Sequence, residues 1–206
     1  MKGEVVGAVL AGGRGRRLGR DKALLVIDGR TLLRRATDAL RSVGLDVVLV
    51  LRPDQPVPEE IDSTAIVRDE VEDAGPLGGL HALLRQLPAE WALVVPCDQP
   101  FLAPELLRGL LAEPRNDLQA IVGRPARRIE PLPGLYRRTC LPVIEGALAR
   151  GERSLQGLLS LLRVRAVPGK TLRRWDPSLR SYLNVNTPKD LARARARAAP
   201  AGKMES

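Results

Sequence analysis

The 206-residue sequence has few aromatic, histidine and cysteine side chains. Aromatic residues make up 2% of the chain, which argues against binding of single-stranded nucleic acid, because bases stack on exposed rings. His81 is the only histidine, and Cys97 and Cys140 lie far apart with no CxxC pattern. The spacing therefore excludes a zinc site, and a Ser–His–Asp triad would have to use His81.

Long apolar runs and targeting segments are also missing from the sequence. No apolar stretch approaches the ~20 residues of a membrane-spanning helix. The N-terminus leads directly into a strand, without the separate charged and apolar regions of a signal peptide. We therefore expect a soluble, cytoplasmic protein with reduced thiols and no membrane partner.

What the chain does have is positive charge, with a net charge of +9 and a pI near 10.5. Such a balance favours anionic partners. The basic residues are scattered, apart from the first loop and the tail from Lys189 to Arg197, whose Ala-Arg alternation predicts a solvated helix face. Nucleic acid is therefore the less favoured anionic partner. Only five of the 33 basic residues are lysines, which makes the lysine at position 22 informative.

The apolar pattern alternates between strands and helices joined by short connections. The expected strands are Val5–Leu10, Asp46–Leu51, Ile66–Val67, Trp91–Val95, Gln119–Val122, Leu132–Tyr136 and Val164–Val167. The expected helices are Thr31–Val43, Leu77–Leu87, Pro104–Leu111, Leu141–Ala149, Ser154–Leu161 and Thr187–Ala198. Apolar strands without polar alternation indicate a sheet that is buried on both faces and mostly parallel. We expect one doubly wound α/β domain over residues 1–199 and a disordered tail over residues 200–206.

The first strand leads into a loop that is rich in glycine and in cations. Ala11-Gly12-Gly13 follows the strand, and the next residues include Arg14, Arg16, Arg17, Arg20 and Lys22. Paired glycines expose backbone N–H groups at the carboxyl edge of a sheet, and the cations can neutralise a polyanion. The pattern therefore predicts a phosphate-binding loop, with a ligand-free surface turn as the alternative.

Two common phosphate loops do not match this segment. The Walker A spacing requires Ser or Thr after its lysine, but Ala23 follows Lys22. The dinucleotide fingerprint requires a glycine at position 18, where the chain has Leu18, and Gly19 comes one residue late. The loop must therefore be of another type.

Polar residues follow other predicted strands at the same edge. Asp98 comes shortly after the strand Trp91–Val95, where its carboxylate can bind Mg²⁺ or form an Asx turn. Asp69 follows Ile66–Val67, and Gly78 and Gly79 let the next helix approach a ligand or the sheet. Before the last helix, Thr187 and Pro188 are explained as helix-start residues. The two asparagines that precede them, Asn184 and Asn186, are not.

Taken in order, these segments resemble the molybdenum cofactor guanylyltransferases from Val5 to Leu191. The shared segments are the strand followed by LAGG-x-x-x-R-x-G-x-D-K, the GPLGG turn, the PCDQPF block and NVNTP before the last helix. The resemblance implies a Rossmann-like nucleotide-diphospho-sugar transferase fold. It also implies Mg²⁺-dependent transfer of GMP from GTP to the terminal phosphate of molybdopterin, with pyrophosphate as the other product.

The resemblance also assigns roles to individual residues. It implies catalytic roles for Lys22, Arg17 and Asp98, and it makes Asp98 the metal ligand. The residues expected to contact the nucleotide are Leu10, Ala11, Gly12, Gly13, Lys22, Asp69 and Asp98. The acceptor side is expected to include Asn184, Asn186 and Arg153, with Arg137 and Arg138 as further candidates. For each of the three arginines, a solvated salt bridge is the equal alternative. The implied partners are GTP, molybdopterin and, through transient contacts, molybdenum cofactor biosynthesis proteins or apo-molybdoenzymes.

One departure from the family pattern bears on the choice of base. Some members of the family have an asparagine after the second strand, whereas this chain has Val48-Leu49-Val50-Leu51-Arg52. Either Arg52 or backbone groups read the base, or the base preference differs. The alternatives are a cytidylyl- or sugar-phosphate nucleotidyltransferase, a nucleic-acid-binding protein and a nucleotide sensor without catalysis.

Overall fold

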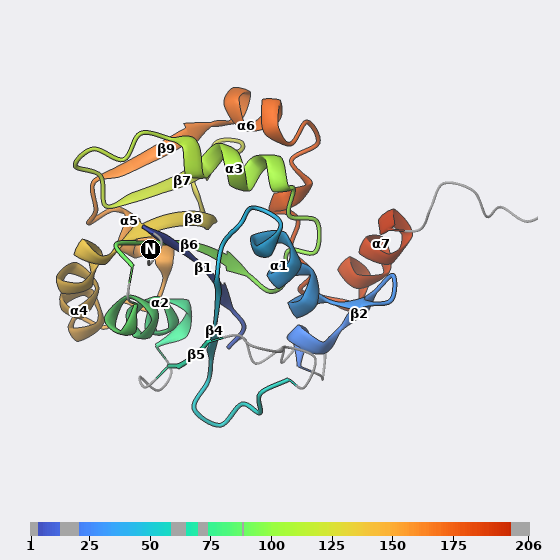
Figure 1. Ribbon diagram of the computed structural model, residues 1–206, viewed down its shortest axis with the longest axis horizontal. Coiled ribbons are helices and arrows are strands. Elements are labelled where there is room, and N and C mark those ends of the chain that lie inside the picture. Colours follow the sequence, from blue (N-terminus) through green and yellow to red (C-terminus); the bar gives the residue numbers. More distant parts are fainter. Residues whose placement is uncertain (1–3, 13–20, 59–64, 70–73, 88, 199–206) are drawn as a thin grey trace, which may run out of the picture.

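A seven-stranded sheet forms the centre of the computed structural model (Figure 1). The structure describes residues 4–12, 21–58, 65–69, 74–87 and 89–198. The strands of the sheet are β1 (Val5–Leu10), β4 (Val47–Leu51), β5 (Ala65–Arg68), β6 (Trp91–Pro96), β7 (Ala120–Arg124), β8 (Glu130–Arg137) and β9 (Val164–Pro168). A separate small hairpin consists of β2 (Val26–Ile27) and β3 (Arg30–Thr31).

The strand order is β5-β4-β1-β6-β8-β7-β9. The neighbouring pairs are parallel except those that include β8, which runs antiparallel to both β6 and β7. The prediction of a mostly parallel, doubly wound α/β sheet is therefore confirmed. The carboxyl ends of β4, β1 and β6 lie at one edge, because Leu10 pairs with both Val50 and Pro96.

Helices cover both faces of the sheet (Figure 1). One face packs against α2 (Gly75–Gln86), α4 (Leu141–Ala149) and α5 (Leu155–Leu159). The other face packs against α1 (Leu32–Arg41), α3 (Pro104–Ala112) and α6 (Gly169–Trp175). The predicted helices on these faces are confirmed within a few residues at their ends. The sequence prediction missed α6, a short and strongly basic helix.

A third, smaller cluster joins the C-terminal part of the chain to the N-terminal hairpin. It contains Leu25, Ile27, Leu32, Val185 and Ala194. Ala194 belongs to α7 (Pro188–Ala198), which packs beside β2 (Figure 1). The 3-10 turns η1 (Lys22–Leu24), η2 (Arg138–Cys140) and η3 (Arg180–Tyr182) complete the described elements. The predicted tail over residues 200–206 lies outside the described residues.

None of the helices in the described part of the chain is both long and apolar enough to cross a bilayer.

Candidate active site

The site begins at the lysine that the sequence analysis singled out. Lys22 opens η1, whose N-cap is Asp21, because the Asp21 Oδ1 atom accepts a hydrogen bond from the Ala23 N–H at 3.0 Å. The Lys22 ammonium nitrogen lies 3.1 Å from Asp98 Oδ2, and it also donates to the side-chain oxygen of Asn186. The side chains of Lys22 and Asp98 are 16% and 20% exposed. Three segments that are distant in the sequence therefore meet at one partly buried cation.

The C-terminal segment is held at this point by its backbone and by a buried side chain. The Val185 N–H donates to the Asp98 carbonyl oxygen at 2.8 Å, and Val185 is 1% exposed. Asp190 Oδ2 accepts from the N–H groups of Asn186 and Thr187 and from the Thr187 hydroxyl. The Thr187 hydroxyl, together with these N–H groups, lowers the pKa of Asp190. This cap orients the start of α7 and the segment that carries Asn186. Asn184 is exposed, so the structure brings only Asn186 to the lysine.

The backbone at the start of the phosphate loop corrects one expectation. The Ala11 N–H donates to the Val50 carbonyl, and the Leu10 carbonyl accepts from the Cys97 N–H. Ala11 thus continues the sheet, and its N–H is not available to bind a phosphate as expected. The carbonyl oxygens of Ala11 and Gly12 accept from Gln55 and Arg52. Gly13 and Arg17 lie outside the described residues.

Asp69 lies against the first turn of α2. Its N–H donates to the Leu51 carbonyl, which continues the ladder beyond β5. A Cβ atom added to Gly78 would lie 2.8 Å from both Asp69 carboxylate oxygens. Glycine at position 78 therefore lets this carboxylate approach the helix. Gly79 faces Leu10 and Val50 instead, at ordinary van der Waals distances for an added Cβ.

The arginines expected on the acceptor side do not share one location. Arg137 pairs in register with Trp91, at the amino end of β6, and its guanidinium donates to Glu90 and lies over the Trp91 ring. The Arg138 N–H donates to the Glu90 carbonyl. Both arginines therefore lie at the sheet edge opposite Asp98, because β8 runs antiparallel to β6. Arg137 forms an ion pair with Glu90, which is the salt-bridge alternative, and neither arginine lies beside Asp98.

Of the three arginines, Arg153 lies nearest to the carboxyl edge of the sheet, where the site is expected. Its carbonyl oxygen is 3.0 Å from where a Cβ of Gly75 would be, beside the start of α2. Its guanidinium Nη1 atom donates to the carbonyl oxygens of Leu148 and Glu152. The main chain of Arg153 thus borders the carboxyl edge, while its guanidinium caps the end of α4.

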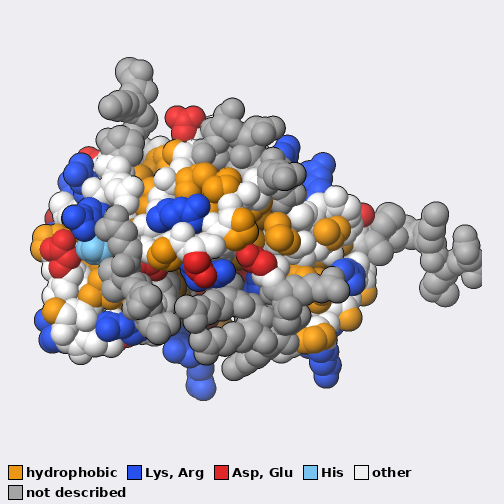
Figure 2. Space-filling view, turned by 90° about the horizontal axis from the view of Figure 1, so that it is seen from below, with side chains coloured by type: hydrophobic (Ala, Val, Ile, Leu, Met, Phe, Trp, Pro, Cys, Tyr) orange, Lys and Arg blue, Asp and Glu red, His pale blue; other side chains and the backbone are white. Residues whose placement is uncertain are grey.

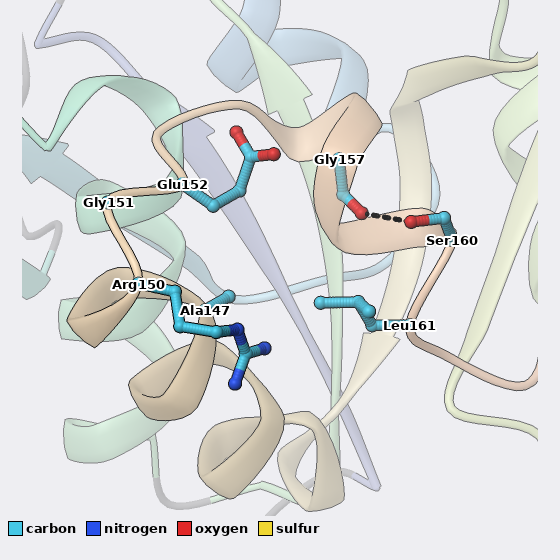
Figure 3. Close-up of a pocket in the computed structure, with 7 residues that line it drawn as sticks. All are labelled: Ala147, Arg150, Gly151, Glu152, Gly157, Ser160 and Leu161. Carbon is cyan, nitrogen blue, oxygen red and sulfur yellow. Dashed lines mark hydrogen bonds between the residues drawn. The ribbon is translucent and has the colours of Figure 1, made fainter.

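A cavity of about 410 Å³ lies near this segment (Figure 3). It is lined by Ala147, Arg150, Gly151, Glu152, Gly157, Ser160 and Leu161. The Glu152 carboxylate accepts from the Ser154 N–H and hydroxyl and from the Arg153 N–H, and the bonds from Ser154 contribute most to lowering its pKa. Ser160 donates to the Gly157 carbonyl, as the dashed line in Figure 3 shows. These polar groups cap α5, and the lining contains none of the predicted site residues.

The neighbouring cysteine and the single histidine do not supply a nucleophile. Cys97 is 5% exposed, and burial together with the adjacent Asp98 raises the pKa of its thiol to about 12. The thiol is therefore neutral at physiological pH. His81 lies on α2, with its Nε2 atom 3.6 Å from Glu145 Oε1 and its side chain 13% exposed. His81 thus contributes to the contact between α2 and α4.

The oxygen donors near Lys22 are of the kind that could hold a divalent metal ion. Among the described residues, no group of three or more His, Cys, Asp and Glu side chains could enclose a metal. The Asp98 carboxylate and the Asn186 amide oxygen both accept a hydrogen bond from the Lys22 ammonium group. Mg²⁺ commonly binds one or two carboxylates and takes its other ligands from phosphates and water. The donor set therefore suits a metal that arrives with a nucleotide.

The chain is similar to known proteins over most of its length. Residues 7–167 match the family described as the MobA-like NTP transferase domain. A molybdenum cofactor guanylyltransferase from Desulfosudis oleivorans is 35% identical over 97% of this chain and 98% of its own. The crystal structure of molybdopterin-guanine dinucleotide biosynthesis protein A from Archaeoglobus fulgidus is 29% identical, with a TM-score of 0.80, over 93% of this chain and 97% of that one.

A more distant structure shares the fold alone. The 2-C-methyl-D-erythritol 4-phosphate cytidylyltransferase from Thermus thermophilus is 20% identical, with a TM-score of 0.66, over 93% of this chain and 97% of its own. The matched domain spans most of the chain, and the relative from Desulfosudis oleivorans is similar over nearly the whole of both chains. The chain belongs to the family of MobA-like NTP transferase domains and is a nucleotidyltransferase.

Proposed function

We propose that this protein transfers GMP from GTP to the terminal phosphate of molybdopterin and releases pyrophosphate. The observation that carries the proposal is the meeting of Lys22, Asp98 and Asn186 at the carboxyl edge of the sheet. The near full-length similarity to a molybdenum cofactor guanylyltransferase supports the choice of substrates. The proposed domain is residues 1–199, and the proposed location is the cytoplasm.

In the proposed reaction, an oxygen of the acceptor phosphate attacks the α-phosphorus of GTP. A new P–O bond forms as the bond to the oxygen that bridges the α- and β-phosphates breaks, and its electron pair leaves with pyrophosphate. No protein nucleophile is required, because the acceptor phosphate is already anionic at neutral pH. This agrees with the neutral, buried Cys97 thiol. Catalysis then depends on positioning and on electrostatic stabilisation.

The residues that meet at the carboxyl edge have separate roles in this proposal. The Lys22 ammonium neutralises charge on the phosphates that leave, and Gly12 lets the backbone approach them. Asp98, with the Asn186 oxygen, would hold Mg²⁺, which supplies a Lewis acid for the phosphate oxygens when it is bound. Asp69 lies beside the α2 turn, where it would border the nucleoside. The roles of Arg17 and Gly13 rest on the sequence alone.

Base selection rests with Arg52 or with backbone groups near it. Arg52 directly follows β4, and its Nη1 atom donates to the Gly12 carbonyl at 3.0 Å. Its guanidinium therefore lies next to the phosphate loop. An arginine suits guanine because it can donate to O6 and N7 together.

The deciding experiment measures pyrophosphate release from GTP, CTP, ATP and UTP, each with Mg²⁺, with and without molybdopterin. We expect release with GTP only, and only when molybdopterin is present. Release with CTP instead would favour a cytidylyltransferase. Binding of GTP without any release, for every acceptor tried, would favour a nucleotide sensor.

A nucleic-acid-binding function makes a different prediction, namely an affinity that falls steeply with salt. On the described part of the face in Figure 2, Lys and Arg side chains are dispersed among acidic and apolar ones. This distribution supports small anionic substrates over a long polyanion. Transient contacts with other proteins of molybdenum cofactor biosynthesis, or with apo-molybdoenzymes, belong to the same proposal.

A further inference from the structure

Gln55 is a buried polar side chain that connects three segments of the site. It is 2% exposed. Its Nε2 atom donates to the Ala11 carbonyl at 3.2 Å and to Asp21 Oδ2 at 3.0 Å. Its Oε1 atom accepts from the Arg52 N–H at 3.3 Å. Both donor hydrogens and the acceptor oxygen of the amide therefore have protein partners.

The two acceptors of Gln55 flank the phosphate loop in the sequence. Ala11 precedes residues 13–20, and Asp21 follows them. Ala11 is fixed to the sheet through its N–H bond to Val50. Asp21 uses its other carboxylate oxygen to cap η1, the turn that begins with Lys22. One amide thus ties the last residues at the sheet edge to the turn that carries the catalytic lysine.

The loop that carries Gln55 is itself held by an arginine from the next strand. The Nη1 atom of Arg68, at the end of β5, lies 2.7 Å from the carbonyl oxygens of both Arg52 and Gln55. It also lies 3.1 Å from the Pro53 carbonyl. These bonds fix the backbone around Gln55, so its amide starts from a defined position. Because Arg68 holds this loop to β5, the hydrogen bond from Gln55 holds Asp21 at a fixed position relative to the sheet.

We propose that Gln55 is a positioning residue that sets the separation between the two flanks of the phosphate loop and so holds Lys22 at Asp98 and Asn186. This inference rests on the proposed function, but it concerns a residue that touches neither the lysine nor its two partners. The side chain at position 55 must be an amide, because it faces two acceptors and one donor. The acceptors are the Ala11 carbonyl and the Asp21 carboxylate, and the donor is the Arg52 N–H. A glutamate at position 55 would bring its carboxylate against the Ala11 carbonyl and the Asp21 carboxylate, with no hydrogen to donate.

The first test compares Gln55→Glu with a matched glutamine elsewhere. Gln119 is 7% exposed, donates to the Thr139 carbonyl at 3.1 Å and accepts from the Arg163 N–H at 3.1 Å. It immediately precedes β7, at the opposite edge of the sheet. We expect Gln55→Glu to lower kcat and raise KM for the nucleotide, with kcat/KM falling about 100-fold, since small displacements of reacting groups have effects of this size. Gln119→Glu should lower Tm but leave both constants within about twofold of the wild type.

The second test reverses the direction of the hydrogen bond between Gln55 and Asp21. In the double variant Gln55→Glu/Asp21→Asn, the amide at position 21 can donate to the carboxylate at position 55 and still accept from the Ala23 N–H. The bond to Ala11 is not restored, so we expect recovery of kcat/KM by about tenfold over Gln55→Glu alone, the value of one hydrogen bond. Equal kcat/KM for the double variant and Gln55→Glu would overturn the proposal, as would unchanged kinetics in Gln55→Glu.

A binding measurement separates this inference from the reaction proposed above. The dissociation constant of whichever nucleoside triphosphate protects the wild type from thermal unfolding with Mg²⁺ is measured for each variant. We expect weaker binding by Gln55→Glu, recovery in the double variant and no change in Gln119→Glu. If no GMP transfer is found but this order of affinities holds, the proposed function fails and the role of Gln55 stands. Equal affinities across all variants would contradict the role of Gln55.

Discussion

At the scale of single residues, the candidate site contains one cation held between two oxygen donors. Lys22 reaches Asp98 across 76 residues of sequence and Asn186 across 164. Its side chain is mostly buried, so its charge acts in an environment with less screening than bulk water. This arrangement suits a group that must neutralise phosphate charge without a covalent step.

Removing either charge should reduce turnover without unfolding the protein. We expect Lys22→Met and Asp98→Asn each to lower kcat by about 100-fold or more, in line with the loss of a preorganised electrostatic contact. Lys170→Met is the control, because Lys170 is an exposed lysine on α6. Circular dichroism checks the fold, and pyrophosphate release measures kcat. Near-normal transfer by Asp98→Asn would contradict its assignment as the metal ligand.

The two cysteines should behave as buried, neutral thiols. Burial is the main reason that the pKa values of Cys97 and Cys140 are raised to about 12. We expect neither to react with a thiol reagent in the native protein at pH 8, and both to react after unfolding in guanidinium. Because the folded pKa is raised, the associated stability is present below pH ~9 and is lost as the pH rises toward 12. Rapid labelling of native Cys97 would show that it is accessible.

At the scale of elements, the first turn of α2 is shaped by two adjacent glycines with different surroundings. An added Cβ at Gly78 would lie 2.5 Å from the Ala74 Cβ and 2.8 Å from the Asp69 carboxylate. At Gly79 the shortest such distance is 3.4 Å, to Val50. The helix therefore tolerates a side chain at one position and not at its neighbour.

We expect Gly78→Ala to displace Asp69 and to weaken nucleotide binding, while Gly79→Ala has a small effect. The steric conflict should lower the free energy of unfolding by about 1–3 kcal/mol at position 78. At position 79, alanine instead benefits from its higher helix propensity. Urea unfolding and nucleotide titrations of the two variants make the comparison. Equal nucleotide affinity in both variants would show that Asp69 does not border the site.

At the scale of the whole molecule, segments that are 164 residues apart in the sequence meet at the candidate site. The family match ends at residue 167, whereas the amide oxygen beside Lys22 comes from Asn186. Val185 anchors this segment through its buried side chain and its N–H bond to Asp98. The C-terminal segment therefore contributes a side chain to the candidate site, beyond the residues that the family match covers.

The need for this segment in turnover can be tested by comparing Val185 with an equally buried valine elsewhere in the fold. Val185 and Val167 are both 1% exposed. We expect Val185→Ala and Val167→Ala each to lower the free energy of unfolding by about 1–3 kcal/mol, through lost burial and a small cavity. Only Val185→Ala should also lower kcat, because its loosened segment carries Asn186. Similar kcat values for the two variants would indicate that the segment is not needed for turnover.

The elements that could be predicted from the sequence are those with a strong local pattern. The apolar runs of β1, β4 and β6 predict buried parallel strands, and their carboxyl ends place Lys22 and Asp98 at a common edge. Gln55 could not be found in this way. It lies in a proline-rich loop and gives no local sign of its burial, which depends on Ala11 and Asp21 from other segments.

The sequence by itself determined the alternation of strands and helices and the place of an aspartate shortly after β6, because these depend on side chains that are close in the chain. Only the tertiary structure decided the direction of β8, which carries Arg137 to the edge away from Asp98. Tertiary packing likewise decided which of the two asparagines reaches Lys22. Strand direction and long-range contacts depend on the shared core and on hydrogen bonds between distant segments. A local sequence pattern contains no information on either of these.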